Sequence, residues 1–420
     1  MLNSRSVALT RVGWVAGTAA VVVALLVVVA DQIPHFVLFG PFRRMCDLTV
    51  YRRAGGAVLN GTSIFARPHG ALPFTYPPFA AILAVPFVRG SAQVVQIFWT
   101  LAQLAMLGVV IFLTARRTRP DFARETALAI AALFTLLMVF TQPIQLDIRF
   151  GQVNLLLMLL VFLDLMPKST PWPRGVLIGV AAAIKLVPAI FVVYLLVTGR
   201  TRAAVTAIVS FLTCTALAWA VLPASSHDYW LHLIFVSRRT GRPTYWSNQS
   251  IFGILDRSMS MPMSTMIAIA VVVPLALFGF ERARRAWRAG DDLTGMLLIG
   301  LLSIACSPVS WVHHLDWIAP VVAILAVARA RGRRRVVAVL VWLAFVLDLA
   351  HRGSLLALSN PAGVAHLLSV LLEDSYGLIV IALIFVIPTR NVAEALPPPA
   401  SASTAKPVLE DTRVSVPSAR

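Results

Sequence analysis

The sequence predicts an all-α membrane protein, built as a polytopic bundle of helices. Three observations support this fold class: 59% of the 420 residues are hydrophobic, only 13% are charged, and the mean hydropathy is +0.83. A soluble domain is nearer half apolar and a quarter charged, and three cysteines are too few for a disulfide-built secreted scaffold. At about 20 residues per span and about 10 per connection, the length accommodates about 10 to 13 spans.

Long apolar runs follow one another along most of the chain. The first, residues 7–30, is too long for the apolar segment of a signal peptide and is expected to be an uncleaved anchor. The later runs, each a candidate span, are 93–114, 125–140, 152–166, 176–197, 203–222, 263–280, 293–306, 315–328, 336–350 and 366–387.

Arginine clusters indicate which connections face the cytoplasm. They lie at 116–119, 281–288 and 329–335, and placing them inside puts both termini inside as well. This orientation, together with anionic lipid headgroups, explains the net charge of +18 better than nucleic-acid binding does. The eight histidines all lie in or beside the segments that become outer, so polar chemistry is expected on that face. These outer segments are 31–91, 141–151, 223–262, 307–314 and 351–365.

Two segments do not fit a simple span. Run 176–197 contains Lys185 and Pro188, a charge and a helix breaker at membrane depth, so we expect a broken or re-entrant helix pair there. Segment 73–89 is short and proline-rich and is expected to be an interfacial or re-entrant element on the outer face. Residues 1–390 are expected to form one membrane domain, and the Pro-, Ser- and Ala-rich residues 391–420 a disordered cytoplasmic tail.

The first outer segment contains a lone carboxylate, Asp47, at the start of a run with helical apolar spacing. An Asp in this position either caps the helix N-terminus or acts as a general base at the membrane surface. Arg43 and Arg44 precede it and could hold a lipid phosphate. Arg52 and Arg53 are at least as well explained by contact with lipid headgroups.

Lys185 is the most costly residue to place in the membrane, because an ammonium group there costs about 2.5–3.5 kcal/mol even on the insertion scale. Such residues usually face a cavity or a partner of opposite charge. The phosphate of a lipid carrier is one fitting partner, and an ion pair with Asp147, Asp164 or Asp348 is the alternative.

Amide and aromatic side chains gather at the predicted outer ends of the helices. Tyr76 lies in an aromatic, proline-rich turn that is also typical of an interfacial aromatic belt. Four amides, Gln152, Asn154, Asn248 and Gln249, either tie helices together or bind the hydroxyls of a sugar.

His313 and His314 lie side by side in the outer segment 307–314. Adjacent residues of a helix point about 100° apart, so we expect only one of the two rings to face a given site. The spacing also argues against a two-histidine metal site, which needs positions i and i+4. The sequence has no zinc signature, phosphate-binding glycine loop or nucleophile elbow.

Six short motifs, taken in order, resemble those of the actinobacterial polyprenyl-phosphate-mannose-dependent α-(1→2)-mannosyltransferases, which belong to the GT-C class and to glycosyltransferase family 87. The resemblance extends from about residue 40 to 320, and its specificity lies in the order and spacing of the set. The motifs are Asp47-Leu-Thr-Val-Tyr51, Phe74-Thr-Tyr-Pro-Pro-Phe79, Gly151-Gln-Val-Asn154, Lys185-Leu-Val-Pro188, Asn248-Gln-Ser250 and Ser307-Pro-Val-Ser-Trp-Val-His-His314.

This resemblance implies a GT-C glycosyltransferase whose active site lies at the outer face of the plasma membrane. It implies a polyprenyl-phosphate-mannose donor and, as acceptor, a mannose 2-hydroxyl of a lipid-linked glycan such as phosphatidylinositol mannoside or lipomannan. An α-linkage formed from a β-linked donor inverts the anomeric centre, for which one general base suffices. No cofactor is implied, and no metal is expected because Leu48 follows Asp47 where many GT-C enzymes carry a second acid.

The resemblance also implies roles for the site residues. Asp47 occupies the position of the catalytic base, and a histidine of the pair His313 and His314 belongs to the same site. The donor phosphate is expected to contact Lys185, Arg43, Arg44 and Arg149, and the sugars Tyr51, Tyr76, Gln152, Asn154, Asn248 and Gln249.

Three other functions are compatible with parts of the pattern. A related transferase would move another lipid-linked sugar, for example arabinofuranose. A lipid-linked-sugar transporter or flippase would need a polar path across the membrane and inverted repeats, whereas the polar residues here concentrate on one face. A scaffold subunit without chemistry would tolerate loss of Asp47.

Overall fold

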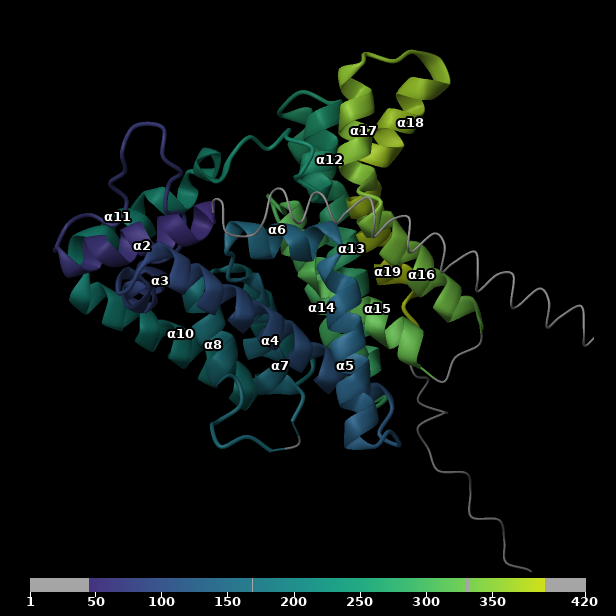
Figure 1. Cartoon of the computed structure of the whole chain (residues 1–420), viewed down its shortest axis with the longest axis horizontal. Helices are drawn as coiled ribbons and strands as arrows, with labels where there is room; N and C mark the ends of the chain where they lie inside the picture. Colours follow the sequence, from purple (N-terminus) through teal and green to yellow (C-terminus); the bar gives the residue numbers. More distant parts are fainter. Residues whose placement is uncertain (1–44, 168, 329–331, 390–420) are drawn as a thin grey trace, which may run out of the picture.

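The computed structural model describes residues 45–167, 169–328 and 332–389, and within these ranges every regular element is a helix (Figure 1). This confirms the predicted all-α class. Three helices are each long and apolar enough to cross a membrane: α4 (Ala92–Thr118), α10 (Thr201–Val221) and α13 (Met263–Arg288). The protein is a multi-pass membrane protein.

Several of the predicted runs are bent instead of straight. If each of three bent pairs crosses once, the described residues contain up to six spans of sufficient length. The pairs are α5 (Arg124–Val139) with α6 (Gln142–Phe150) at 81°, α16 (Gly332–Val346) with α17 (Leu349–Leu358) at 46°, and α18 (Gly363–Glu373) with α19 (Ser375–Val386) at 63°. Shorter apolar helices complete the bundle: α7 (Asn154–Leu165), α14 (Asp292–Ala305) and α15 (Ile318–Val327). The predicted first anchor, 7–30, and the tail, 391–420, lie outside the described residues.

The expected break within run 176–197 is confirmed. Helix α8 (Val176–Ile184) ends at Lys185, whose backbone is extended with φ −150° and ψ 133°. A single 3-10 turn, η2 (Val187–Ala189), contains Pro188 and leads into α9 (Ile190–Val197). Proline cannot donate the backbone hydrogen bond that a continuous helix would need at this point.

Short helices cover one side of the bundle. In Figure 1 these include α2 (Cys46–Leu59) and α11 (Pro223–Leu231) at the upper left, and α12 (Ile251–Ser258), α17 and α18 at the upper right. Helix α5 runs from the lower side of this view up to α6. The segment expected to be interfacial, 73–89, forms α3 (Pro78–Leu83) and the 3-10 helix η1 (Val85–Val88).

The interior is apolar, and so is much of the outer surface. Helix α14 lies at the centre, where every residue from Leu293 to Ala305 is buried. On α10 and α13 the pattern is reversed, because large apolar side chains such as Leu212 and Leu277 are more than half exposed. Exposed leucines at this density are typical of helices that face lipid.

Helix α2 is positioned by a close contact with the start of η1. An added Cβ at Gly55 would lie 2.7 Å from the carbonyl oxygen of Ala84, whereas one at Gly56 would meet nothing within 4 Å. We therefore expect Gly55→Ala to lower the free energy of unfolding by about 1–3 kcal/mol through overpacking. Gly56→Ala is the matched control and is expected to be neutral or stabilising by up to about 1 kcal/mol, because alanine is the better helix former.

The measurement is the thermal unfolding midpoint of each variant in detergent, followed by fluorescence-detected size-exclusion chromatography. Equal midpoints for Gly55→Ala and Gly56→Ala would show that α2 is free to move away from η1.

Candidate active site

A cavity of about 1350 Å³ opens among the short helices. All five segments predicted to be outer contribute to its lining, although they are far apart in sequence. The cavity is larger than the 300–1,000 Å³ that is typical of pockets for drug-sized ligands. Representative lining residues from the five segments are Asp47, Arg149, Trp246, His313 and His351.

Asp47 lies in the first turn of α2 and lines the cavity. Its Oδ2 accepts a hydrogen bond of 2.7 Å from Nε2 of Gln152. The capping interpretation is wrong, because the N-cap residue of α2 is Met45 and, among the described residues, no side chain caps this terminus. Burial raises the pKa of Asp47 to about 6, while the hydrogen bond from Gln152 and the charge of Lys185 act in the opposite direction. Asp47 is therefore a carboxylate of raised basicity inside a cavity.

Gln152 is held by two phenols and by the end of α6. Its Oε1 accepts hydrogen bonds from the hydroxyls of Tyr51, at 3.1 Å, and Tyr76, at 2.9 Å. Gly151 ends α6 with φ 71°, a left-handed conformation that glycine adopts without cost. A Cβ at this position would lie 2.7 Å from Cβ of Leu48 on α2. The turn at Gly151 thus brings the amide of Gln152 against α2 and fixes its orientation toward Asp47.

Asn154 joins three parts of the site. Its Nδ2 donates to Oδ1 of Asp147, at 2.7 Å, and to the backbone oxygen of His313, at 2.8 Å. Its Oδ1 accepts a hydrogen bond of 2.8 Å from Nζ of Lys185. Gln103 completes the surroundings of Asp147 by donating to its Oδ2 at 3.0 Å. The expected contact between Lys185 and an intramembrane acid is thus made through an amide, because Asn154 lies between Lys185 and Asp147.

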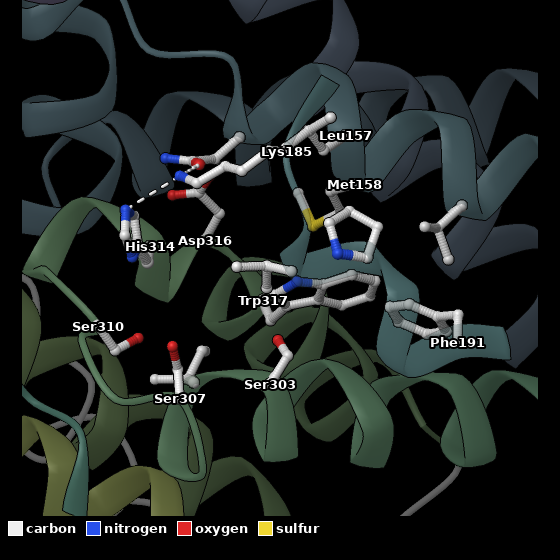
Figure 2. A pocket seen from close by; sticks show the side chains of 15 residues that line it. Leu157, Met158, Lys185, Phe191, Ser303, Ser307, Ser310, His314, Asp316 and Trp317 are labelled. Atoms are coloured by element: carbon white, nitrogen blue, oxygen red, sulfur yellow. Dashed lines mark hydrogen bonds between the residues drawn. The ribbon is translucent and has the colours of Figure 1, made fainter. Parts of the chain in front are cut away.

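Lys185 lines both the large cavity and a small neighbouring chamber of about 40 Å³ (Figure 2). In Figure 2, Lys185, His314 and Asp316 converge at one end of this chamber, and Ser303, Ser307 and Ser310 lie along its side. The Nζ of Lys185 lies 3.0 Å from Nε2 of His314. Asp316 is fully buried, and in the described part of the chain neither of its carboxylate oxygens has a hydrogen-bond partner. A chamber of this size can hold a few waters, and Asp316 is the group that needs them.

His313 and His314 both line the large cavity, so the expectation that only one ring would face the site is wrong. The expectation assumed α-helical geometry. The segment is instead a 3-10 helix, η5 (Val312–Trp317), with non-helical torsions at Leu315. The two rings contact each other edge to face, with centroids 4.7 Å apart, and His313 also packs edge to face on Phe150.

The remaining predicted site residues divide into three groups. Arg149 is exposed and lines the large cavity, while Arg43 and Arg44 lie outside the described residues. Asn248 and Gln249 are fully buried and do not line it.

The two buried amides bind backbone groups. Asn248 Oδ1 accepts from the backbone N–H of Ser310 at 2.8 Å, and Gln249 Nε2 donates to the backbone oxygen of Glu373 at 2.8 Å. They hold the loop at 247–250 against the segment that precedes η5 and against the end of α18.

Some residues of the site were not singled out from the sequence. Gln103 supports Asp147 from the middle of α4, and its only sequence signal is a polar residue within an apolar run. Trp99, one turn earlier, donates from Nε1 to the backbone oxygens of Gly151 and Gln152. Asp348 and His351 line the other end of the cavity. The sequence suggested Asp348 only as an ion-pair partner of Lys185, and no motif pointed to His351. Among the described residues, no group of three or more His, Cys, Asp or Glu side chains has an arrangement suited to a metal ion.

Comparison with known proteins agrees with the motifs. The family model described as glycosyltransferase family 87 matches residues 74–308, more than half of the chain. A Mycobacterium tuberculosis protein named polyprenol-phosphate-mannose-dependent alpha-(1-2)-phosphatidylinositol mannoside mannosyltransferase is 34% identical over 319 residues, covering 72% of this chain and 74% of that protein. The Mycolicibacterium smegmatis protein of the same name is 35% identical over 323 residues, covering 70% of this chain and 72% of that protein.

Among solved structures, the chain matches ArnT from Cupriavidus metallidurans bound to undecaprenyl phosphate with a TM-score of 0.40 and 15% identity. The alignment covers 86% of this chain and 76% of that chain. The family match and the two mycobacterial relatives confirm the resemblance inferred from the six motifs. The chain is a membrane glycosyltransferase and belongs to glycosyltransferase family 87.

Proposed function

We propose that this protein is an inverting mannosyltransferase. It transfers mannose from polyprenyl-phosphate-mannose to a mannose 2-hydroxyl of phosphatidylinositol mannoside or a related lipid-linked mannan. The names of the mycobacterial relatives support this donor, this acceptor and the α-(1→2) linkage. The observation that carries the proposal is Asp47, a half-buried carboxylate that Gln152 orients inside a cavity large enough for two glycolipid headgroups.

Asp47 acts as the general base. It accepts the proton of the acceptor hydroxyl while that oxygen forms a bond to the anomeric carbon of the donor. The bond from this carbon to the phosphate oxygen breaks on the opposite face, and the polyprenyl phosphate leaves with the electron pair. A phosphate is already a good leaving group, so one carboxylate is enough and no protonated acid is required.

The leaving phosphate gains negative charge, which a nearby cation stabilises. Lys185 is suited to this role, because its ammonium group borders the cavity and is held by Asn154 and His314. Arg149 is a second candidate on the same cavity, and His313 and His314 border it as well. Tyr51 and Tyr76 orient Gln152 and line the region beside Asp47 where the reacting sugars meet.

We also propose that this cavity opens on the outer side of the plasma membrane, with both termini in the cytoplasm. The arginine clusters at 116–119 and 281–288 support this orientation. Anionic phosphate and sugar headgroups then meet the protein in the aqueous layer, while the polyprenyl and acyl chains remain in the bilayer.

The first test is the loss of the base. Asp47→Asn keeps the shape of the side chain and removes its ability to accept the proton, so we expect mannosyl transfer to fall by about 10²–10⁴-fold. The measurement is transfer of radiolabelled mannose from polyprenyl-phosphate-mannose to membrane glycolipids, in membranes that lack the native protein. Asp228→Asn is the matched control, because this exposed carboxylate lies on α11 and does not line the cavity.

The fold can be checked in the same samples. Burial disfavours the charged form of Asp47, so Asp47→Asn is expected to retain or raise the thermal unfolding midpoint. Full transfer activity of Asp47→Asn would show that Asp47 has only a structural role. Transfer of arabinofuranose but not mannose by the native protein would reassign the donor.

The rate of mannosyl transfer should fall at low pH, because Asp47 must be deprotonated to act as the base. Its pKa is raised to about 6, so the base is protonated and inactive below that value. We expect kcat/KM to be constant above pH 7 and to fall about tenfold per pH unit below pH 6.

This loss is not an unfolding effect of Asp47. A raised pKa means that the folded state binds the proton more tightly, so protonation of this group stabilises the fold at low pH. The pH profile is measured with the unfolding midpoint at pH 5 as control, and a midpoint of the acid limb near pH 4 would point to a different, solvated carboxylate.

The role of Lys185 is tested by Lys185→Met, which keeps an unbranched stem of similar length and removes the charge. Loss of one stabilising contact to a developing anion is expected to lower kcat by about 10²–10³-fold. Arg89→Met removes an exposed positive charge that does not line the cavity and is the matched control. Equal rates for Lys185→Met and native protein would show that Lys185 does not contact the leaving phosphate, which would then bind in another part of the cavity.

A further inference from the structure

The large cavity extends from α2 to α17, and its two ends differ in chemistry. Figure 1 shows α2 and α17 on opposite sides of the molecule, and α6 packs against both α2 and α16 between them. The match to the family model ends at residue 308, so α17 lies beyond it. We call the far end of the cavity the α17 wall and define it by five lining residues: Tyr245, Trp246, Trp311, Asp348 and His351.

An aspartate and a histidine form a pair on the α17 wall. The Nδ1 of His351 lies 3.2 Å from Oδ2 of Asp348, and their side chains are 42% and 25% exposed. A carboxylate at Nδ1 fixes the ring and leaves Nε2 for a different partner. Within the described ranges, no protein group contacts this second nitrogen through a hydrogen bond. The pair therefore offers hydrogen-bonding groups of fixed position to whatever enters the cavity.

Aromatic rings hold this pair and extend the wall. The ring of Trp246 lies against His351, with centroids 5.0 Å apart and an angle of 31° between the planes. Tyr245 contacts both Trp246 and Trp311 and is itself 52% exposed. Aromatic faces beside a few fixed polar groups are typical of sites for ligands with one apolar and one polar side. A pyranose ring is such a ligand, because its C–H groups pack on an aromatic face while its hydroxyls take up hydrogen bonds.

The backbone supports the orientation of Asp348. This residue lies at the bend between α16 and α17, with φ 56° and ψ 42°. A left-handed conformation is uncommon outside glycine, although Asp and Asn adopt it more readily than other residues. The hydroxyl of Tyr376 approaches Oδ1 of Asp348 at 3.5 Å. Helix, bend and neighbouring phenol together direct a carboxylate to the cavity surface.

We propose that the α17 wall is a second carbohydrate subsite. It binds a sugar ring of the acceptor that is not the ring receiving the new mannose, and so it selects acceptors by the length of their glycan. The inference rests on the proposed function for the identity of the acceptor as a mannosylated lipid. Asp348, His351 and Arg352 line this end of the cavity together, and the hydroxyls of a neutral sugar fit such a mixture of hydrogen-bond acceptors and donors. The cavity volume of about 1350 Å³ leaves room for this additional ring.

The test compares two synthetic acceptors with the same lipid tail, one carrying a single α-mannose and the other an α-linked mannotriose. We expect the native protein to favour the trisaccharide in kcat/KM. His351→Ala and Asp348→Asn should reduce this preference about tenfold, which corresponds to about 1.4 kcal/mol. Asn is chosen at 348 because it tolerates the left-handed backbone. His366→Ala, an exposed histidine on α18 that does not line the cavity, is the control and should leave the preference unchanged.

A binding measurement separates this inference from the proposed function. Affinity of the mannotriose lipid is measured by tryptophan fluorescence in the Asp47→Asn background, with and without His351→Ala. Weaker binding with His351→Ala supports the subsite even if the native protein transfers no mannose, in which case only the proposed function fails. Mannose transfer with an unchanged preference for the trisaccharide in both wall variants overturns the subsite and leaves the proposed function intact. An equal loss with both acceptors, or a dependence on an anionic headgroup instead of glycan length, also overturns it.

Discussion

The half-buried hydrogen bond from Gln152 to Asp47 is the contact on which the rest of the site depends. It joins α2 to the junction of α6 and α7, two parts of the chain separated by 105 positions. The geometry requires Gly151, since any side chain there would collide with Leu48. Tyr51 and Tyr76 contact the oxygen of this amide, and the carboxylate of Asp47, which can only accept, selects its N–H end. A carboxylate, an amide and two phenols thereby act as one unit, and each hydrogen bond is stronger because water is excluded.

The distribution of charge follows from this burial. Asp47, Asp147 and Asp316 all act electrostatically on Lys185. Asp147 is satisfied by amides from α4 and α7, whereas Asp316 borders a small chamber without a protein partner in the described chain. Buried ions are costly unless they are paired or hydrogen-bonded. Lys185 is thus a cation with three acids around it, in the position where the proposed function places the phosphate of the donor.

The site forms where helices are interrupted. Helix α5 bends by 81° into α6, α8 breaks at Lys185, and α16 bends by 46° into α17. Each interruption frees backbone groups and directs side chains into the cavity instead of into lipid. Irregular backbone at membrane depth is tolerated where it lines a cavity. The polar chemistry of the protein and the irregularity of its helices therefore have the same origin.

Much of this could be predicted from the sequence, because it depends on local composition and period. The hydropathy of the chain predicts the all-α class, and the pair Lys185 and Pro188 within an apolar run predicts the break in that helix. The positions of the arginine clusters predict that five segments lie on the same side of the membrane, and all five line one cavity. Asp47 was recognisable because a lone acid in an otherwise matching motif has few alternative roles.

Other features were decided by the tertiary structure. From the residues alone the role of Asn248 and Gln249 stayed open, and the resemblance implied sugar binding. Their partners are instead the backbone N–H of Ser310, just before η5, and the backbone oxygen of Glu373, the last residue of α18. An amide binds a backbone carbonyl as well as a hydroxyl, so only its neighbours determine which it meets. The 3-10 geometry of η5 brings both histidines to the cavity, and the fold brings Asp348 and His351 to the same space as Asp47. Those outcomes depend on contacts between residues far apart in the chain, which periodicity and spacing do not contain.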